Sequence, residues 1–207
     1  MSSKTNNSKR LEAYHGKTEV KEKYVSRMKA HIDADELIHG EGWKDGKGCA
    51  VGCTLNKYNH ACYQDELGLP EWLAQLEDKI FENMSLEKSK TYPLLLLQSI
   101  PIGVSLDKTY HKFCKYILTD IVKDCNEEPV RKAIEFVLSQ HEKAIKGEII
   151  TIPELGRMYS AAGSAAGSAA WSAARSAARS AAGSAAWSAA YDKMADRLIE
   201  LLKESDQ

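Results

Sequence analysis

Several features that would assign a compartment are missing from this 207-residue sequence. Outside the alanine-rich segment 160–191, no apolar run is long enough to cross a bilayer, which takes about 20 predominantly hydrophobic residues. The opening stretch, MSSKTNNSKR, is polar and lacks the hydrophobic centre of a secretory signal. We therefore expect a cytoplasmic protein with no membrane span.

An excess of one charge is also missing. The 28 lysines and arginines are balanced by 29 acidic residues, for a formal net charge of −1. This balance argues against nucleic acid as the partner, because a nucleic-acid-binding surface usually needs a basic excess. The five cysteines form an odd number, and without a secretory signal we expect them to be reduced thiols.

The most regular feature that is present is the segment 160–191, eight uninterrupted tetrads of the form Ser-Ala-Ala-x. Alanine has the highest helix propensity, and four residues are close to one helical turn. Each tetrad advances the helix by about 400°, so no fixed coiled-coil seam forms. The small side chains instead form i, i+4 ridges that suit close helix packing. We predict a long C-terminal helix, or a helical hairpin broken near Gly163 and Gly167.

Arginines within the tetrads argue against reading this segment as a membrane helix. Arg175 and Arg179 lie near its middle, and each costs about 2.5–3.5 kcal/mol on membrane-insertion scales. We expect the helix to pack on the rest of the chain or on a second copy. We also expect a homo-oligomer that forms through the segment 160–191.

Elsewhere the apolar residues recur mainly at helical spacing, which favours an all-α, multi-helix domain. Prolines indicate the starts of two further helices, at Pro70 and Pro93. The periodic segments are 17–39, 106–124 and 129–146, and residues 49–56 read as a short buried helical turn. We predict three parts: a disordered N-terminus (1–11), a helical domain (12–150) and an alanine-rich helical region (151–207).

The segment GKGCAVGCT, residues 46–54, has the highest density of chemically useful side chains. One hypothesis is a zinc site, with four thiol and imidazole ligands of the types that zinc prefers. A second hypothesis is a nucleophilic thiol at Cys49 or Cys53, activated by a histidine, with glycine amides as an oxyanion hole. The predicted zinc ligands are Cys49, Cys53, His60 and Cys62.

A third hypothesis for the same segment is a site for a small anionic ligand, held by a glycine-rich turn that leads into a helix. The segment matches neither of the standard glycine-rich nucleotide motifs. The structural alternative is that the glycines permit close backbone packing and the thiols are small core side chains. The candidate ligand-binding residues are His15, Trp43, Lys47, Gly48, Cys49, Gly52, Thr54, Arg175 and Arg179.

A resemblance bears on the setting of the protein. The chain combines YHGK near its start, GKGCAVGCT followed by YNH and LGLPEWLAQLEDKIFE, and alanine-rich tetrads that end in YDKMADRLIELLK. In this it resembles a group of uncharacterised bacterial and bacteriophage proteins. The resemblance implies a phage or bacterial setting and assigns no activity.

These observations together favour a non-enzymatic cytoplasmic binding or interaction protein. In a phage setting, such a protein would be an accessory protein that sequesters a small ligand or inhibits a host protein. The alternative is a cysteine-dependent or zinc-assisted enzyme centred on the segment from Cys49 to Cys62.

Overall fold

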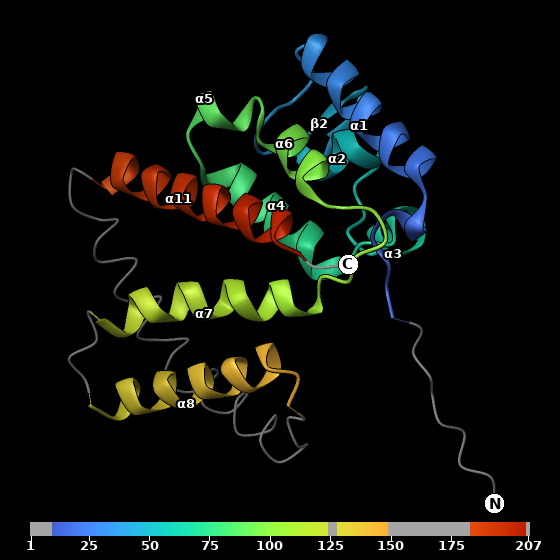
Figure 1. Ribbon diagram of the computed structural model, residues 1–207. Coiled ribbons are helices and arrows are strands. Elements are labelled where there is room, and N and C mark those ends of the chain that lie inside the picture. The colour runs from blue at the N-terminus through green and yellow to red at the C-terminus, as the bar shows by residue number, and fades with distance from the viewer. Residues whose placement is uncertain (1–9, 124–127, 149–182, 206–207) are drawn as a thin grey trace, which may run out of the picture. The chain divides into compact units, whose positions relative to one another are not determined.

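Helices form most of the chain in the computed structural model, which describes residues 10–123, 128–148 and 183–205 (Figure 1). Within these residues the only sheet is a two-stranded ribbon, so the expected all-α, multi-helix fold is confirmed. No helix in the described ranges is both long enough and apolar enough to cross a membrane. The chain forms two units: unit 1 is Met1–Glu82, Ser89–Leu106 and Leu202–Gln207, and unit 2 is Asn83–Lys88 and Asp107–Leu201.

Unit 1 begins with the short 3₁₀ helix η1 (Ala13–Gly16) and the helix α1 (Thr18–Asp33). The prediction of one helix over 17–39 was wrong at its C-terminal end. Asp35 adopts a left-handed φ of 54°, and Leu37 pairs with Gly48 as an isolated parallel bridge. Backbone pairing with a distant segment therefore replaces the last helical turns that the apolar spacing indicated.

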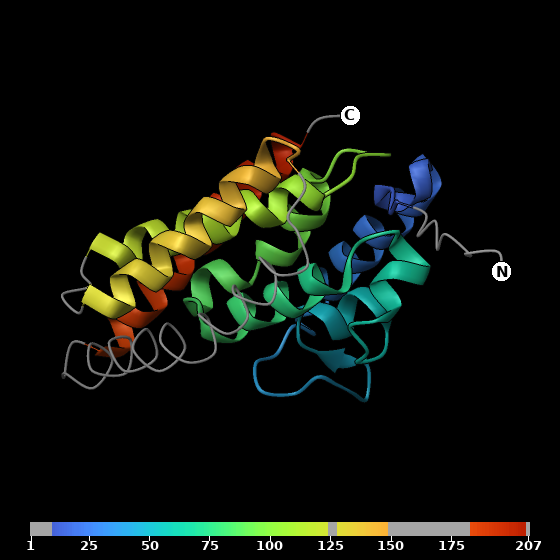
Figure 2. The same cartoon turned by 90° about the horizontal axis from the view of Figure 1, so that it is seen from below.

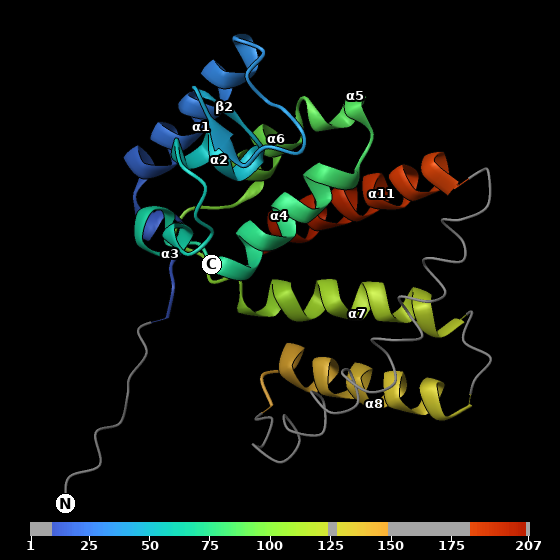
Figure 3. The ribbon, with the colours of Figure 1, turned by 180° about the vertical axis from the view of Figure 1, so that it is seen from behind.

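Residues 43–55, which we call the Gly/Cys segment, follow as a ribbon and a helical turn. Strands β1 (Trp43–Lys44) and β2 (Lys47–Gly48) are antiparallel. The two residues between them both have positive φ, 51° at Asp45 and 83° at Gly46, which matches a tight hairpin turn. The short helix α2 (Ala50–Leu55) comes directly afterwards, as predicted, and Figure 3 shows it beside β2.

Further helices complete unit 1, and both proline-marked starts are confirmed. Helix α4 (Glu71–Asn83) begins just after Pro70, and α6 (Tyr92–Ser99) carries Pro93 in its first turn. The helix α3 (Cys62–Leu67) was not predicted. Gly68 ends α3 with a φ of 64°.

Aromatic and aliphatic side chains from these helices form the core of unit 1. Helix α1 packs against both α2 and α6, and Figure 1 shows α6 and α2 beside α1. The largest fully buried side chains are Tyr14, Tyr24, Tyr63, Tyr92, Phe81, Met28, Leu67, Leu69, Leu73, Ile80, Leu96 and Leu97. Four of these are tyrosines, so this core contains hydroxyl groups that need hydrogen-bond partners.

Unit 2 contains the predicted helices of the second half of the chain. Helices α7 (Asp107–Lys123) and α8 (Glu128–Ile145) match the predicted segments 106–124 and 129–146 within two residues. The two helices pack against each other, as Figures 1 and 2 show. Their buried residues include Phe113, Val130, Ile134 and Val137.

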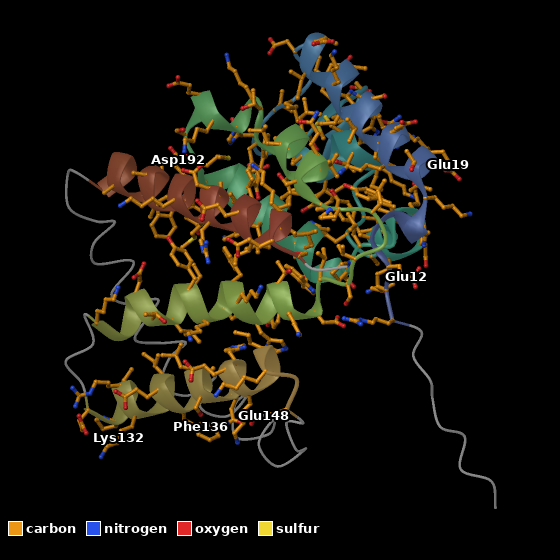
Figure 4. The ribbon with its side chains drawn as sticks, in the orientation of Figure 1. Glu12, Glu19, Lys132, Phe136, Glu148 and Asp192 are labelled. Atoms are coloured by element: carbon orange, nitrogen blue, oxygen red, sulfur yellow. The ribbon has the colours of Figure 1, made fainter. Side chains whose placement is uncertain are left out.

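The C-terminal helix α11 (Gly183–Lys203) contains the last two tetrads. Earlier tetrads lie outside the described residues, so a continuous rod or a hairpin stays a prediction. Within unit 2, Trp187 on α11 donates from Nε1 to Asn83 Oδ1 at 3.1 Å. Asp192, labelled in Figure 4, accepts hydrogen bonds from Ser85 N at 3.0 Å and Ser85 Oγ at 3.1 Å.

Candidate functional site

Backbone contacts fix the Gly/Cys segment in place. Cys49 N donates to Glu41 O at 2.9 Å and to Gly42 O at 3.2 Å. A Cβ atom on Gly48 or on Gly52 would collide with the carbonyl oxygen of Gly42. These two glycines therefore permit a close backbone approach, which is the structural alternative that the sequence left open.

Cys49 lies in a cluster with two acidic residues of α4. Its Sγ and one carboxylate oxygen each from Asp78 and Glu82 all lie within 4.8 Å of one another. Asp78 and Glu82 share a face of α4 because they are four residues apart. Cys49 is 1% exposed, whereas both acidic side chains are partly exposed. We call this set the Cys49–Asp78–Glu82 cluster.

Polar groups from the preceding loops support the two carboxylates. Tyr58 donates its hydroxyl proton to Asp78 Oδ2 at 2.8 Å. Gly40 donates its amide proton to Glu82 Oε2 at 2.8 Å. His60 Nε2 lies 3.4 Å from the same Asp78 oxygen, and its ring meets the Tyr58 ring edge-on.

Two polar atoms at this site lack a hydrogen bond. His60 Nε2 and Asp78 Oδ1 are both buried, and neither has a partner of hydrogen-bond geometry among the described residues. The 3.4 Å approach of His60 to Asp78 is thus an electrostatic contact without a well-formed hydrogen bond. Buried polar atoms are nearly always paired, so such atoms indicate an ion, a water molecule or a ligand.

The thiols of the Gly/Cys segment are not of the reactive type. Burial raises the pKa of Cys49, and the neighbouring carboxylate of Asp78 raises it further. Burial also raises the pKa of Cys53 to about 12, although a backbone hydrogen bond with Gly48 acts in the opposite direction. Both groups are therefore protonated thiols near neutral pH, whereas a nucleophilic cysteine needs a lowered pKa.

The structure does not bring the four predicted zinc ligands into one group. Across the described ranges, the one group of three or more closely spaced ligand atoms contains only Cys49 of the predicted four. Cys53 Sγ instead donates to Gly48 O at 3.4 Å, and Cys62 is the first residue of α3. The assumption of a shared helical face failed because Cys49 caps α2 with an extended ψ of −179° and is not within the helix.

His15 and Trp43, predicted to bind a ligand, have separate partners. His15 Nε2 lies 3.0 Å from the carbonyl oxygen of Asp65. Trp43 packs edge-on against the His31 ring, with the centroids 5.5 Å apart. Neither side chain belongs to the Cys49–Asp78–Glu82 cluster.

Thr54 and Lys47, two further residues predicted to bind a ligand, lie in different environments. Thr54 Oγ1 donates to Ala50 O at 2.9 Å and is buried. Lys47 is exposed on β2. Arg175 and Arg179 lie outside the described residues, so their role stays a prediction.

The sequence reading missed Asp78 and Glu82. The apolar residues Leu73, Ile80 and Phe81 define the inner face of α4, and acidic residues between apolar positions are typical of a solvated helix face. A pair of carboxylates at i, i+4 was the signal that was present. This carboxylate pair indicates a site only when the fold places Cys49 beside it.

Glu77, the neighbour of Asp78, belongs to a separate buried network. Tyr63 donates its hydroxyl proton to Glu77 Oε2 at 2.6 Å. Burial raises the pKa of Glu77 to about 8, opposed by the Tyr63 hydrogen bond and reinforced by the charge of Asp78. Glu77 Oε1 and the hydroxyl of Tyr92 are buried without a hydrogen-bond partner in the part of the chain described.

Comparison with known proteins yields no relative: no protein-family model, curated protein or solved structure matches this chain. The resemblance to bacterial and phage proteins therefore stays a prediction. Function must therefore be inferred from the chemistry of the site alone.

Proposed function

We propose that the chain is a non-enzymatic binding protein that holds a small ligand at the Cys49–Asp78–Glu82 cluster. The observation that supports this is the convergence of a thiol and two carboxylates from distant parts of the sequence within 4.8 Å. His60 and Tyr58 add an imidazole and a hydroxyl at Asp78. A thiol and two carboxylates held close together, with an imidazole and a hydroxyl in contact with one of them, favour recognition of a ligand.

The arrangement favours binding over nucleophilic catalysis. In a cysteine hydrolase the histidine contacts the thiol, and an acidic or amide group orients that histidine. Here the carboxylate of Asp78 lies beside the Cys49 thiol, raises its pKa and also contacts His60. With a raised pKa at Cys49 and a side chain only 1% exposed, attack on a substrate is disfavoured.

Thiol reactivity tests this proposal against the enzyme alternative. The full chain is treated with iodoacetamide under native conditions and in urea, and alkylation of Cys49 is followed by peptide mapping. We expect native alkylation at Cys49 to be slower than in urea by at least about 100-fold, because the thiol is buried and protonated. Native labelling of Cys49 as fast as that of a free thiol would reject the binding proposal in favour of the cysteine-dependent enzyme.

We also propose that the protein is cytoplasmic, self-associates through the segment 160–191 and acts as a phage accessory protein. Small side chains at i, i+4 support helix pairing, and Trp171 adds apolar area within the tetrads. Native mass spectrometry of the full chain over a range of concentrations tests the assembly. A strict monomer at every concentration would remove self-association from the proposal.

A further inference from the structure

We infer that the ligand of this site is a divalent transition-metal ion of the zinc class. Its ligands are Cys49, Asp78 and Glu82. His60, which lies outside this group but contacts Asp78, would complete the set after a side-chain movement. This inference depends on the proposed binding function, and it replaces the predicted Cys₃His set by one thiolate, two carboxylates and one imidazole.

The positions of the ligand atoms suit such an ion after a small contraction. A tetrahedral zinc with bonds of about 2.0–2.3 Å holds its ligand atoms roughly 3.3–3.7 Å apart. The Sγ of Cys49 and the oxygens of Asp78 and Glu82 already lie within 4.8 Å of one another. Closing this gap takes about 1 Å, which side-chain rotation on α4 can supply.

Charge at the cluster also favours a cation. Two carboxylates stand beside a buried thiol, and the hydrogen bonds that reach them come from neutral donors, the Tyr58 hydroxyl and the Gly40 amide. Like charges held close together in a partly buried site repel one another. A divalent ion would turn this repulsion into attraction, so the acidic pair is better explained with a cation than with the small anion expected from the sequence.

An unpaired nitrogen of His60 beside the cluster also favours a metal ion. His60 Nε2 is buried without a hydrogen bond, as is Asp78 Oδ1, among the described residues. The two residues are already in contact at 3.4 Å. A metal bound between Asp78 and His60 would satisfy both atoms, since neutral imidazole nitrogen and carboxylate oxygen are common zinc ligands.

The mixture of ligand types selects among metals. Magnesium and calcium prefer sites made only of oxygen ligands. A thiolate and an imidazole favour zinc or cobalt instead. Binding converts the Cys49 thiol and the free ion into a sulfur–metal bond and one released proton, so affinity increases with pH.

Neighbouring groups would orient the ligands. Tyr58 holds Oδ2 of Asp78, and Gly40 holds Oε2 of Glu82. Outer hydrogen bonds of this kind fix metal-binding carboxylates. A bound ion would also link the loop that carries Gly40, the start of α2 at Cys49 and helix α4.

The experiment is a metal titration of the full chain after treatment with a chelator. Zinc is added in calorimetry and cobalt is followed by absorbance, because a cobalt–thiolate bond gives a charge-transfer band in the near ultraviolet. We expect one strong zinc site, a cobalt band that zinc abolishes, and no competition from magnesium or calcium at equal concentration. Comparable binding of magnesium would overturn the inference, because it would show an all-oxygen site.

Matched variants locate the ion. Cys49→Ser should abolish the cobalt band and weaken zinc binding by about 100-fold or more, and Glu82→Gln should weaken it while the band persists. The controls are Cys53→Ser, the neighbouring buried thiol, and Glu71→Gln in the first turn of α4. Circular dichroism checks the fold of every variant. A cobalt band that survives in Cys49→Ser, or one lost equally in Cys53→Ser, would overturn the assignment.

The metal inference and the binding proposal fail in different ways. If native Cys49 resists iodoacetamide but no zinc or cobalt binds, only the metal inference is rejected. If Cys49 is alkylated rapidly, the binding proposal is rejected, whatever the metal result. If zinc binds at this site, it should further slow the alkylation of Cys49.

Discussion

His111 and His141 face each other from α7 and α8, with their Nδ1 atoms 2.9 Å apart. In this pair one imidazole donates a proton and the other accepts it, so at least one ring must be neutral. Burial lowers the pKa of both, and the nearby His111 lowers that of His141 further, to about 4. The contact between α7 and α8 is therefore sensitive to acid.

Acid should weaken unit 2 through this pair. The unfolded chain protonates His141 near its ordinary pKa of 6.5, whereas the folded chain does so only near about 4. Since the unfolded state then binds more protons, stability is lost as the pH falls from 6.5 towards 4. His141→Gln should reduce this loss in thermal unfolding followed by circular dichroism, while His15→Gln, an exposed control, should keep the wild-type dependence. Equal pH dependence in His141→Gln and wild type would contradict the prediction.

Removing the Tyr63 hydroxyl should destabilise unit 1. Tyr63→Phe leaves the buried Glu77 carboxyl without the donor to Oε2, which costs about 1–3 kcal/mol. Tyr58→Phe, which removes a comparable bond to Asp78 from a side chain that is 50% exposed, should cost less. Urea unfolding measures both.

A double variant tests the cause of that loss. Because an unpaired buried group accounts for most of the cost, Tyr63→Phe combined with Glu77→Leu should be more stable than Tyr63→Phe alone. Additive losses in the double variant would show that packing, and not the unpaired carboxyl, dominates.

Gly52→Ala should disturb the Gly/Cys segment. The added Cβ would collide with the carbonyl oxygen of Gly42, and overpacking of this kind costs about 1–3 kcal/mol. Gly46→Asn is the control, since Gly46 has open space and a φ of 83° that asparagine tolerates better than most residues. A Gly52→Ala variant as stable as wild type in thermal unfolding would show that the loop moves aside freely.

Asp192→Ala should loosen the start of α5 (Leu86–Ser89). The lost bonds to Ser85 N and Oγ resemble a helix cap, and such caps contribute about 0.5–2 kcal/mol. Asp196→Ala removes only an exposed ion pair with Lys88, for which less than about 1 kcal/mol is expected. Chemical denaturation of the two variants should separate them, and equal losses would contradict the proposed cap.

Much of the helical architecture was predictable from local pattern. Pro70 and Pro93 mark real helix starts, and the periodic segments that became α7 and α8 were predicted within two residues. These signals work because capping and helix amphipathicity are local properties of the chain. The end of α1 was not predictable in this way, since Leu37 pairs with Gly48 across the intervening loop. Helical spacing compares residues only three or four positions apart.

The candidate site was likewise predictable only in its local features. The sequence alone determined that the chain is helical and that Cys49 lies in a glycine-rich turn, because propensity and spacing act between near neighbours. Only the tertiary structure decided that Cys49 faces Asp78 and Glu82 and not Cys53 and Cys62. The close approach of Gly42 to Gly48 and Gly52 sets the path of the backbone at the thiol. The physical reason that the sequence could not show the site is that Cys49 and the carboxylates of α4 lie in separate elements, and only tertiary packing brings them together.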